Sequence, residues 1–165
     1  MTRLEGEPTD TEIVQVYKPT SSHSEEEIED VYEQLEEVIA AAKGKENLIV
    51  MRDRNAVVGE GREGRSGAQF GLGKRSPARE KLIEFCTEKN MVVANTLFEQ
   101  HRRKRYTRKM PGDRARYKID YILVRTRYRT QGELCKSYPG ADINSDHNLV
   151  VMESPLRYKK YNKVT

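Results

Sequence analysis

Three short polar segments of this chain adjoin apolar runs and contain side chains that could carry out hydrolytic chemistry. They are Asp53-Arg54-Asn55, Ile119-Asp120-Tyr121 and Ser145-Asp146-His147. The adjoining apolar runs have the length of buried strands and cover residues 48–51, 121–124 and 149–152. Because a charged group inside such a strand needs a partner, we expect these side chains to meet on one rim, at the strand ends. Carboxylates, an amide and an imidazole gathered in this way suit metal-assisted hydrolysis.

The three segments, in this order, resemble the endonuclease/exonuclease/phosphatase superfamily. The closer resemblance is to the apurinic-like endonuclease domain of RTE-type non-LTR retrotransposons, and it runs from about residue 12 to about residue 153. Five further segments fit that subfamily in the expected order, at residues 16–20, 84–86, 95–98, 106–107 and 140–143. One tripeptide alone is weak support for a family, but an ordered set along the chain is specific.

The resemblance implies that Asp53 is the base that activates water. It also implies that Asn55 and Tyr17 donate hydrogen bonds to a phosphate oxygen. His147 would hydrogen-bond the phosphate, while Asp120 holds its other ring nitrogen and fixes the tautomer. These five residues are the catalytic set that we expect.

A divalent cation completes the site that the resemblance implies. Asp146 is the one clear candidate to hold it, and Mg²⁺, or else Mn²⁺, fits its oxygen ligand. The family's early segment, which contributes an asparagine and the metal-binding glutamate, has no match here, so the chain is expected to be N-terminally truncated relative to the family. We therefore expect the cation to be held weakly, if at all.

Three arginines depart from the family pattern. Arg52 and Arg54 stand where the family has glycine and an aromatic residue, and Arg108 stands where it has tryptophan after Tyr-Thr. By strand alternation Arg54 would point away from Asp53 and Asn55, where an unpaired guanidinium is costly. These substitutions predict weak or absent hydrolysis.

Charge is distributed unevenly, although the net charge is only +4. Residues 25–37 hold eight acidic side chains and no basic one, which is typical of a solvated helix face. Residues 102–118 hold nine basic side chains against one acid, with tyrosine and threonine between them, as expected of a segment that follows phosphates. The side chains that we expect to contact DNA are Arg102, Arg103, Lys104, Arg105, Arg108 and Lys109.

Periodicity predicts an alternation of strands and helices, which is an α/β arrangement. Strands are expected at residues 13–17, 47–51, 91–93, near 106, at 119–124 and at 149–152. A capping box at Ser24 and Glu27 begins one helix, which ends near Gly44, and Ser76-Pro77 begins another, which ends near Asn90. The resemblance implies the C-terminal part of a four-layer α/β sandwich, two packed β-sheets flanked by helices. Residues 1–155 would form this domain and residues 156–165 a basic tail.

Several classes of protein are disfavoured. There is no secretory signal and no apolar run long enough to span a bilayer, which predicts an intracellular protein, nuclear or cytoplasmic, without a membrane partner. Cys86 lies in an apolar helical pattern and, with Cys135, forms no CxxC pair, which predicts a buried, reduced thiol. Residues 59–64 match GxGxxG but open into more loop, so no nucleotide cofactor is expected.

Three functions remain in competition. The first is a retrotransposon-type DNA endonuclease domain that hydrolyses phosphodiester bonds with Mg²⁺, weakly or not at all in this chain. The second is a catalytically inactive DNA-binding or scaffold module derived from that domain. The third, a small-molecule phosphatase, is disfavoured because the basic segment at residues 102–118 suits a polyanion better than a small ester.

Overall fold

A five-stranded mixed sheet lies at the centre of the computed structural model, which describes residues 1–16, 24–42, 44–53, 77–141, 144–154 and 156–158. The strand order is β1 (Thr2–Leu4), β3 (Thr11–Val16), β4 (Asn47–Asp53), β8 (Asp120–Arg125) and β5 (Met91–Val93). Strands β3 and β4 are parallel, and the other neighbours are antiparallel. The predicted α/β class is confirmed.

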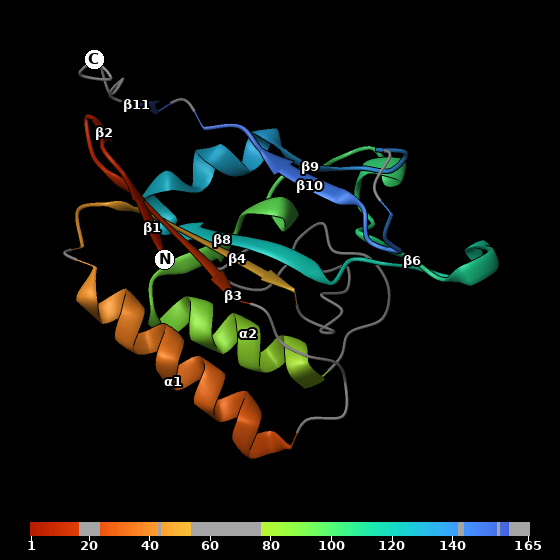
Figure 1. Cartoon of the computed structure of the whole chain (residues 1–165), viewed down its shortest axis with the longest axis horizontal. Helices are drawn as coiled ribbons and strands as arrows, with labels where there is room; N and C mark the ends of the chain where they lie inside the picture. The colour runs from red at the N-terminus through yellow and green to blue at the C-terminus, as the bar shows by residue number, and fades with distance from the viewer. Residues whose placement is uncertain (17–23, 43, 54–76, 142–143, 155, 159–165) are drawn as a thin grey trace, which may run out of the picture.

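Two helices, α1 (Glu25–Ala41) and α2 (Pro77–Glu88), cover one face of this sheet (Figure 1). The predicted capping box begins α1: the Glu27 N–H donates to Ser24 Oγ, and the Ser24 N–H donates to the Glu27 carboxylate. Two orphan N–H groups of the first turn are satisfied in this way. Helix α1 connects the parallel strands β3 and β4, as a crossover between parallel strands requires.

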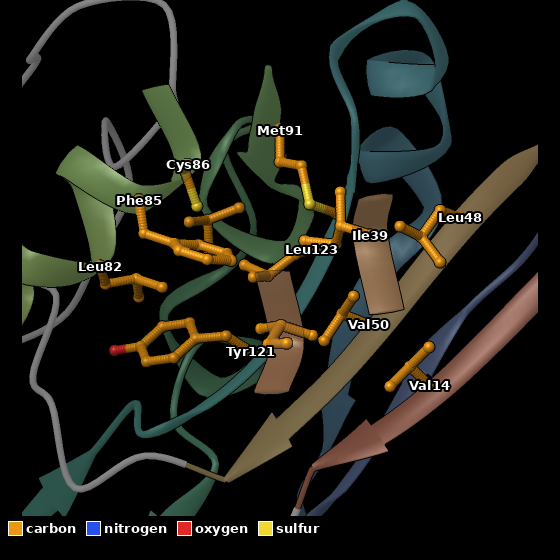
Figure 2. Packing of buried hydrophobic residues seen from close by; sticks show 12 residues of the cluster. Val14, Ile39, Leu48, Val50, Leu82, Phe85, Cys86, Met91, Tyr121 and Leu123 are labelled. Carbon is orange, nitrogen blue, oxygen red and sulfur yellow. The ribbon is translucent and has the colours of Figure 1, made fainter. Parts of the chain in front are cut away.

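The main core lies between these helices and the sheet (Figure 2). Leu35 and Ile39 from α1 are buried, as are Leu82, Phe85 and Cys86 from α2. They pack against side chains on alternate positions of the central strands, namely Leu48, Val50, Tyr121 and Leu123. Because these residues lie two apart along each strand, they all point to the helical side of the sheet.

A second, smaller sheet packs against the opposite face. It pairs β9 (Cys135–Tyr138) with β10 (Leu149–Met152) in antiparallel orientation, and Cys135, Val150 and Met152 contact a cluster with Ile122 and Val124. Two 3-10 helices, η1 (Ala94–Thr96) and η4 (Thr126–Leu134), complete this side. Cys86 and Cys135 are both buried, and neither forms a disulfide bond. In the described part of the chain, no helix is long and apolar enough to cross a membrane.

Short elements form the periphery. A hairpin of β6 (Arg108–Lys109) and β7 (Arg116–Tyr117) extends from the body, with η3 (Pro111–Asp113) at its tip and η2 (Arg102–Lys104) before it (Figure 1). Strand β11 (Arg157–Tyr158), in the segment expected to be a basic tail, pairs with β2 (Gly6–Glu7). The sequence did not predict β1, β2, β7, β9 or β11, because these short strands contain no apolar run like those of β5 and β10.

Arg52 lies in the core and not on the rim. Arg52 is 3% exposed, and its side chain points to the helical side of β4. Its guanidinium carbon lies 4.5 Å from the centroid of the Tyr32 ring. Among the described residues, none offers a hydrogen bond to any of its three guanidinium nitrogens. Burial lowers the pKa of Arg52 to about 10. The cation–π contact with Tyr32 is therefore the interaction that offsets part of the cost of burying the Arg52 charge.

Replacing Arg52 by methionine should stabilise the fold. An apolar side chain of similar length removes the desolvation cost, which exceeds the cation–π attraction to Tyr32, so we expect the free energy of unfolding to rise by about 1–3 kcal/mol. Urea unfolding followed by circular dichroism measures the change, with Arg129→Met, at an exposed position, as the control. A lower free energy of unfolding in Arg52→Met would contradict this account.

Candidate active site

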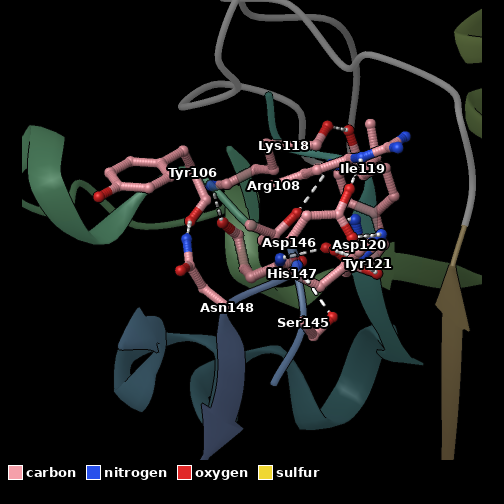
Figure 3. A network of polar contacts seen from close by, with 12 residues as sticks. Tyr106, Arg108, Lys118, Ile119, Asp120, Tyr121, Ser145, Asp146, His147 and Asn148 are labelled. Atoms are coloured by element: carbon pink, nitrogen blue, oxygen red, sulfur yellow. Dashed lines mark hydrogen bonds and ion pairs between the residues drawn. The ribbon is translucent and has the colours of Figure 1, made fainter. Parts of the chain in front are cut away.

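A carboxylate and an imidazole meet at the rim where β8 begins. Asp120 is the first residue of β8, and His147 comes two residues before β10. The His147 Nδ1 lies 3.1 Å and 3.0 Å from the two carboxylate oxygens of Asp120 (Figure 3). Because a carboxylate only accepts, Nδ1 carries the hydrogen. This contact fixes the ring orientation and directs Nε2 away from Asp120.

Asp146 lies beside this pair, and its carboxylate forms an ion pair with the side chain of Arg108. Its Oδ1 is 3.9 Å from His147 Nε2, while the Nε of Arg108 donates to its Oδ2 at 2.8 Å. This hydrogen bond from Arg108 holds the pKa of Asp146 below its usual range. The carboxylate expected to hold a metal is therefore paired with a guanidinium.

Two buried polar side chains hold the start of β8 in place. Thr107 Oγ1 accepts hydrogen bonds from the backbone N–H groups of Ile119 and Asp120, each at 3.0 Å. The Asn95 amide donates to the Asp120 carbonyl at 2.9 Å and accepts from the Ile122 N–H at 3.3 Å. Sequence patterns do not single out Thr107 or Asn95 as site residues, although both lie in segments that carry the family resemblance.

Lys118 is a third buried group beneath the rim. It is 2% exposed, and its Nζ donates to the Asn95 carbonyl at 2.6 Å. Burial lowers the pKa of Lys118 to about 8. Its own carbonyl accepts a hydrogen bond from the Tyr121 hydroxyl, so this residue joins the rim to the core.

The remaining catalytic candidates fall at or beyond the limits of the described residues. Tyr17 and Asn55 lie outside them, as does the glycine-rich segment at residues 59–73. The backbone of Asp53 is described, and its Cα pairs with that of Asp120 across β4 and β8; its side chain lies outside the description. The roles of all five predicted catalytic residues stay predictions.

The residues predicted to contact DNA differ in how exposed their side chains are and in whether they are already paired within the protein. Arg102, Arg103 and Lys104 form η2 and are exposed, and Lys109 on the hairpin is exposed as well. Arg105 is not free in this way: its side chain is 12% exposed, its Nε donates to the Gln100 carbonyl at 2.6 Å, and its Nη2 lies 3.1 Å from the Glu99 carboxylate.

The described residues do not fit the divalent cation that the resemblance implies. Arg108 already occupies one side of the Asp146 carboxylate at 2.8 Å. Among the described residues, no three His, Cys, Asp or Glu side chains lie close enough together to hold a metal ion. A second positive charge beside Asp146 would also be repelled by the guanidinium.

A groove of about 320 Å³ opens beside Asp120. It runs between the central sheet and β10, and its lining is mostly apolar, with Met51, Ile122 and Leu149 among the residues that face it. Met51 is 36% exposed and Leu149 is 47% exposed, so this part of the sheet face is open at the surface. The rim site thus lies at the edge of this groove, which Asp120 helps to line.

Comparison with known proteins agrees with the motif-based resemblance. Craniofacial development protein 2 of Bos taurus and that of Tragulus javanicus are each 37% identical over 163 residues. The match covers 99% of this chain but only 28% of either relative. The endonuclease domain of TRAS1, a telomere-specific non-LTR retrotransposon, superposes with a TM-score of 0.59 at 16% identity, covering 97% of this chain and 63% of that one. No protein-family model matches the chain.

Because of Lys118, the free energy of unfolding should rise with pH above about pH 8. Its pKa is about 8 in the folded chain against 10.5 when unfolded. Between these values the unfolded chain keeps a proton that the folded chain has lost, so raising the pH favours folding. From about pH 8 to about pH 9 the wild type should gain about 1 kcal/mol relative to Lys118→Met. Parallel unfolding curves of both proteins measure this, and equal pH dependence would contradict the lowered pKa.

Proposed function

We propose that this chain, which is similar along 99% of its length to a segment of craniofacial development protein 2 and has the fold of a retrotransposon endonuclease domain, is a DNA endonuclease-type domain with weak or absent hydrolysis. The observation that carries the proposal is the Asp120–His147 pair, joined directly to a basic hairpin. The proposed unit is the domain at residues 1–155, acting on DNA inside the cell.

His147 is the proposed contact to the phosphodiester. With Nδ1–H bonded to Asp120, Nε2 faces outward beside Asp146, and in the imidazolium form its N–H can donate to a phosphate oxygen. The backbone position of Asp53, opposite Asp120, suits the family-implied base that takes a proton from water. Stabilising the charge that develops on the phosphate calls for a bound cation, and the described residues contain no group of three His, Cys, Asp or Glu side chains to hold one, which is the reason to expect slow hydrolysis.

The neighbourhood of the pair favours DNA over a small phosphate ester. Strand β6 is hydrogen-bonded to the segment that carries His147. The backbones of Arg108 and His147 form an antiparallel β-bridge, and the Lys109 N–H donates to the Asp146 carbonyl at 3.0 Å. The basic residues of the hairpin and η2 thus extend from the pair itself. The acidic helix α1 lies elsewhere, beneath the central sheet (Figure 1). Such a separation of charge would orient a polyanion on the hairpin side.

One observation favours the second candidate, a DNA-binding or scaffold module without hydrolysis. The ion pair between Arg108 and Asp146 engages the carboxylate that an active endonuclease would use. Both candidates predict DNA binding at the same rim, and they differ only in whether the bound strand is cut.

The chain should relax supercoiled plasmid DNA poorly or not at all in the presence of Mg²⁺. Hydrolysis at this rim lacks the charge stabilisation that phosphoryl transfer needs. Gel electrophoresis of plasmid with and without EDTA is the measurement, with His147→Ala as the matched control. Robust nicking that EDTA abolishes and His147→Ala removes would show instead that the rim suffices for catalysis.

The exposed cations of η2 should contribute sequence-independent DNA affinity. Changing Arg102, Arg103 and Lys104 together to alanine should weaken binding and reduce the salt dependence by up to about three ion equivalents. Fluorescence anisotropy of a labelled duplex over a salt series measures the slope. Alanine at three exposed cations elsewhere, Lys45, Lys81 and Arg129, is the control and should change the slope less. Equal slopes in the two triple variants would remove η2 from the interface.

A further inference from the structure

We propose that Arg108 takes the place of a divalent cation at this site, so that its guanidinium and His147 together bind a nucleic-acid phosphate without metal. The inference rests on the proposed function, since it assumes that a nucleic-acid phosphate docks at the Asp120–His147 pair. It differs from the family expectation, in which a metal ion beside Asp146 neutralises the phosphate.

Backbone pairing holds Arg108 next to the imidazole. Arg108 forms an isolated antiparallel bridge with His147 and is the first residue of β6. On either side of the bridge, the Lys109 N–H donates to the Asp146 carbonyl at 3.0 Å and the Asn148 N–H donates to the Thr107 carbonyl at 2.7 Å. Backbone pairing therefore places the Cα atoms of Arg108 and His147 opposite each other.

Asp146 orients the guanidinium and leaves part of it available. The single hydrogen bond between the two side chains uses the Nε of Arg108, at 2.8 Å from Oδ2. The Arg108 side chain is 35% exposed, and its two Nη atoms, which donate to no other described residue, remain to meet phosphate oxygens. A guanidinium presents its donors in a planar fork that matches two oxygens of a phosphate, which a hydrated ion held by one carboxylate does not.

The neighbouring cations of the hairpin are placed differently. Arg116 is bound by both carboxylate oxygens of Asp113, at 2.7 Å and 2.6 Å, and lies over the Tyr106 ring at 4.7 Å. Lys109 follows Arg108 in the strand and so projects to the opposite face of the hairpin. Among the cations of β6 and β7, Arg108 is thus the one that shares the rim with His147, and Lys109 offers a matched control of equal charge one residue away.

The first experiment measures binding of a short labelled DNA duplex by fluorescence anisotropy in EDTA. The wild type should bind without metal. Arg108→Ala should weaken binding by about tenfold, because a charge-assisted hydrogen-bond pair is lost, while Lys109→Ala should weaken it by about threefold or less. Arg108→Lys keeps the charge without the fork and should fall between wild type and Arg108→Ala. Thermal melts of each variant establish that the fold is retained.

The second experiment measures Mn²⁺ binding by isothermal titration calorimetry, without DNA. Wild type should bind no Mn²⁺ at this site, because Arg108 engages Asp146. Because Arg108→Ala leaves Asp146 as a single free carboxylate, that variant should gain weak Mn²⁺ binding, and adding Asp146→Asn to it should abolish the gain. Saturable Mn²⁺ binding by the wild type that Asp146→Asn removes would overturn the inference.

The outcomes separate this inference from the proposed function. If His147→Ala weakens DNA binding in EDTA but Arg108→Ala does not, the proposed function stands and the role of Arg108 falls. If the wild type binds DNA only when a divalent ion is added, the metal-free site falls while DNA binding stands. If the wild type binds no DNA under either condition, both fall.

Discussion

Thr107 makes four hydrogen bonds that connect the hairpin, the start of β8 and the segment before β10. Its N–H donates to the Tyr117 carbonyl, its carbonyl accepts from the Asn148 N–H, and its hydroxyl oxygen accepts from the N–H groups of Ile119 and Asp120. The residue is 1% exposed, so these bonds form away from competing water. The relative positions of the imidazole, its carboxylate partner and the basic hairpin all depend on this one side chain and its backbone.

The register between β4 and β8 is the second constraint. Ile49 pairs with Val124 and Asp53 pairs with Asp120. Because side chains alternate along a strand, this register turns Val50 and Leu123 toward the helices and leaves the first residue of β8 at the rim. A slip of one residue would exchange the two faces, so the same pairing that fills the core also exposes the carboxylate that holds His147.

Two basic side chains, Arg52 and Lys118, are buried in this structure and are compensated differently. Lys118 donates to the Asn95 carbonyl at 2.6 Å, whereas the Arg52 guanidinium lies over the Tyr32 ring and has no hydrogen-bond partner in the described part of the chain. Both groups are destabilised as cations by burial, and both have a lowered pKa for that reason. Lys118 belongs to the network beneath the rim, while nothing in the structure explains why position 52 holds arginine.

The ion pair between Arg108 and Asp146 bears directly on whether the site could hold a metal ion. The ion pair ties the basic hairpin to the rim and at the same time occupies a carboxylate that could otherwise hold a metal. A partly exposed pair of this kind contributes little to stability, so its consequence lies in what the site can bind. Under the proposed function, it would favour binding of a nucleic-acid phosphate over its hydrolysis.

Local patterns in the sequence determined the longer elements of this protein. The capping box and apolar spacing predicted α1, the Ser-Pro start predicted α2, and apolar runs predicted β4, β8 and β10, because each signal depends only on neighbouring residues. The motif order likewise predicted that Asp120 and His147 meet. Only the tertiary structure decided that Arg108 pairs with Asp146, that Thr107 and Asn95 hold the start of β8, and that Arg105 is engaged by Glu99. Three of these contacts join residues 12 to 38 positions apart, and even the short-range pairing of Arg105 depends on how the chain turns before the hairpin, so neither spacing nor composition encodes them.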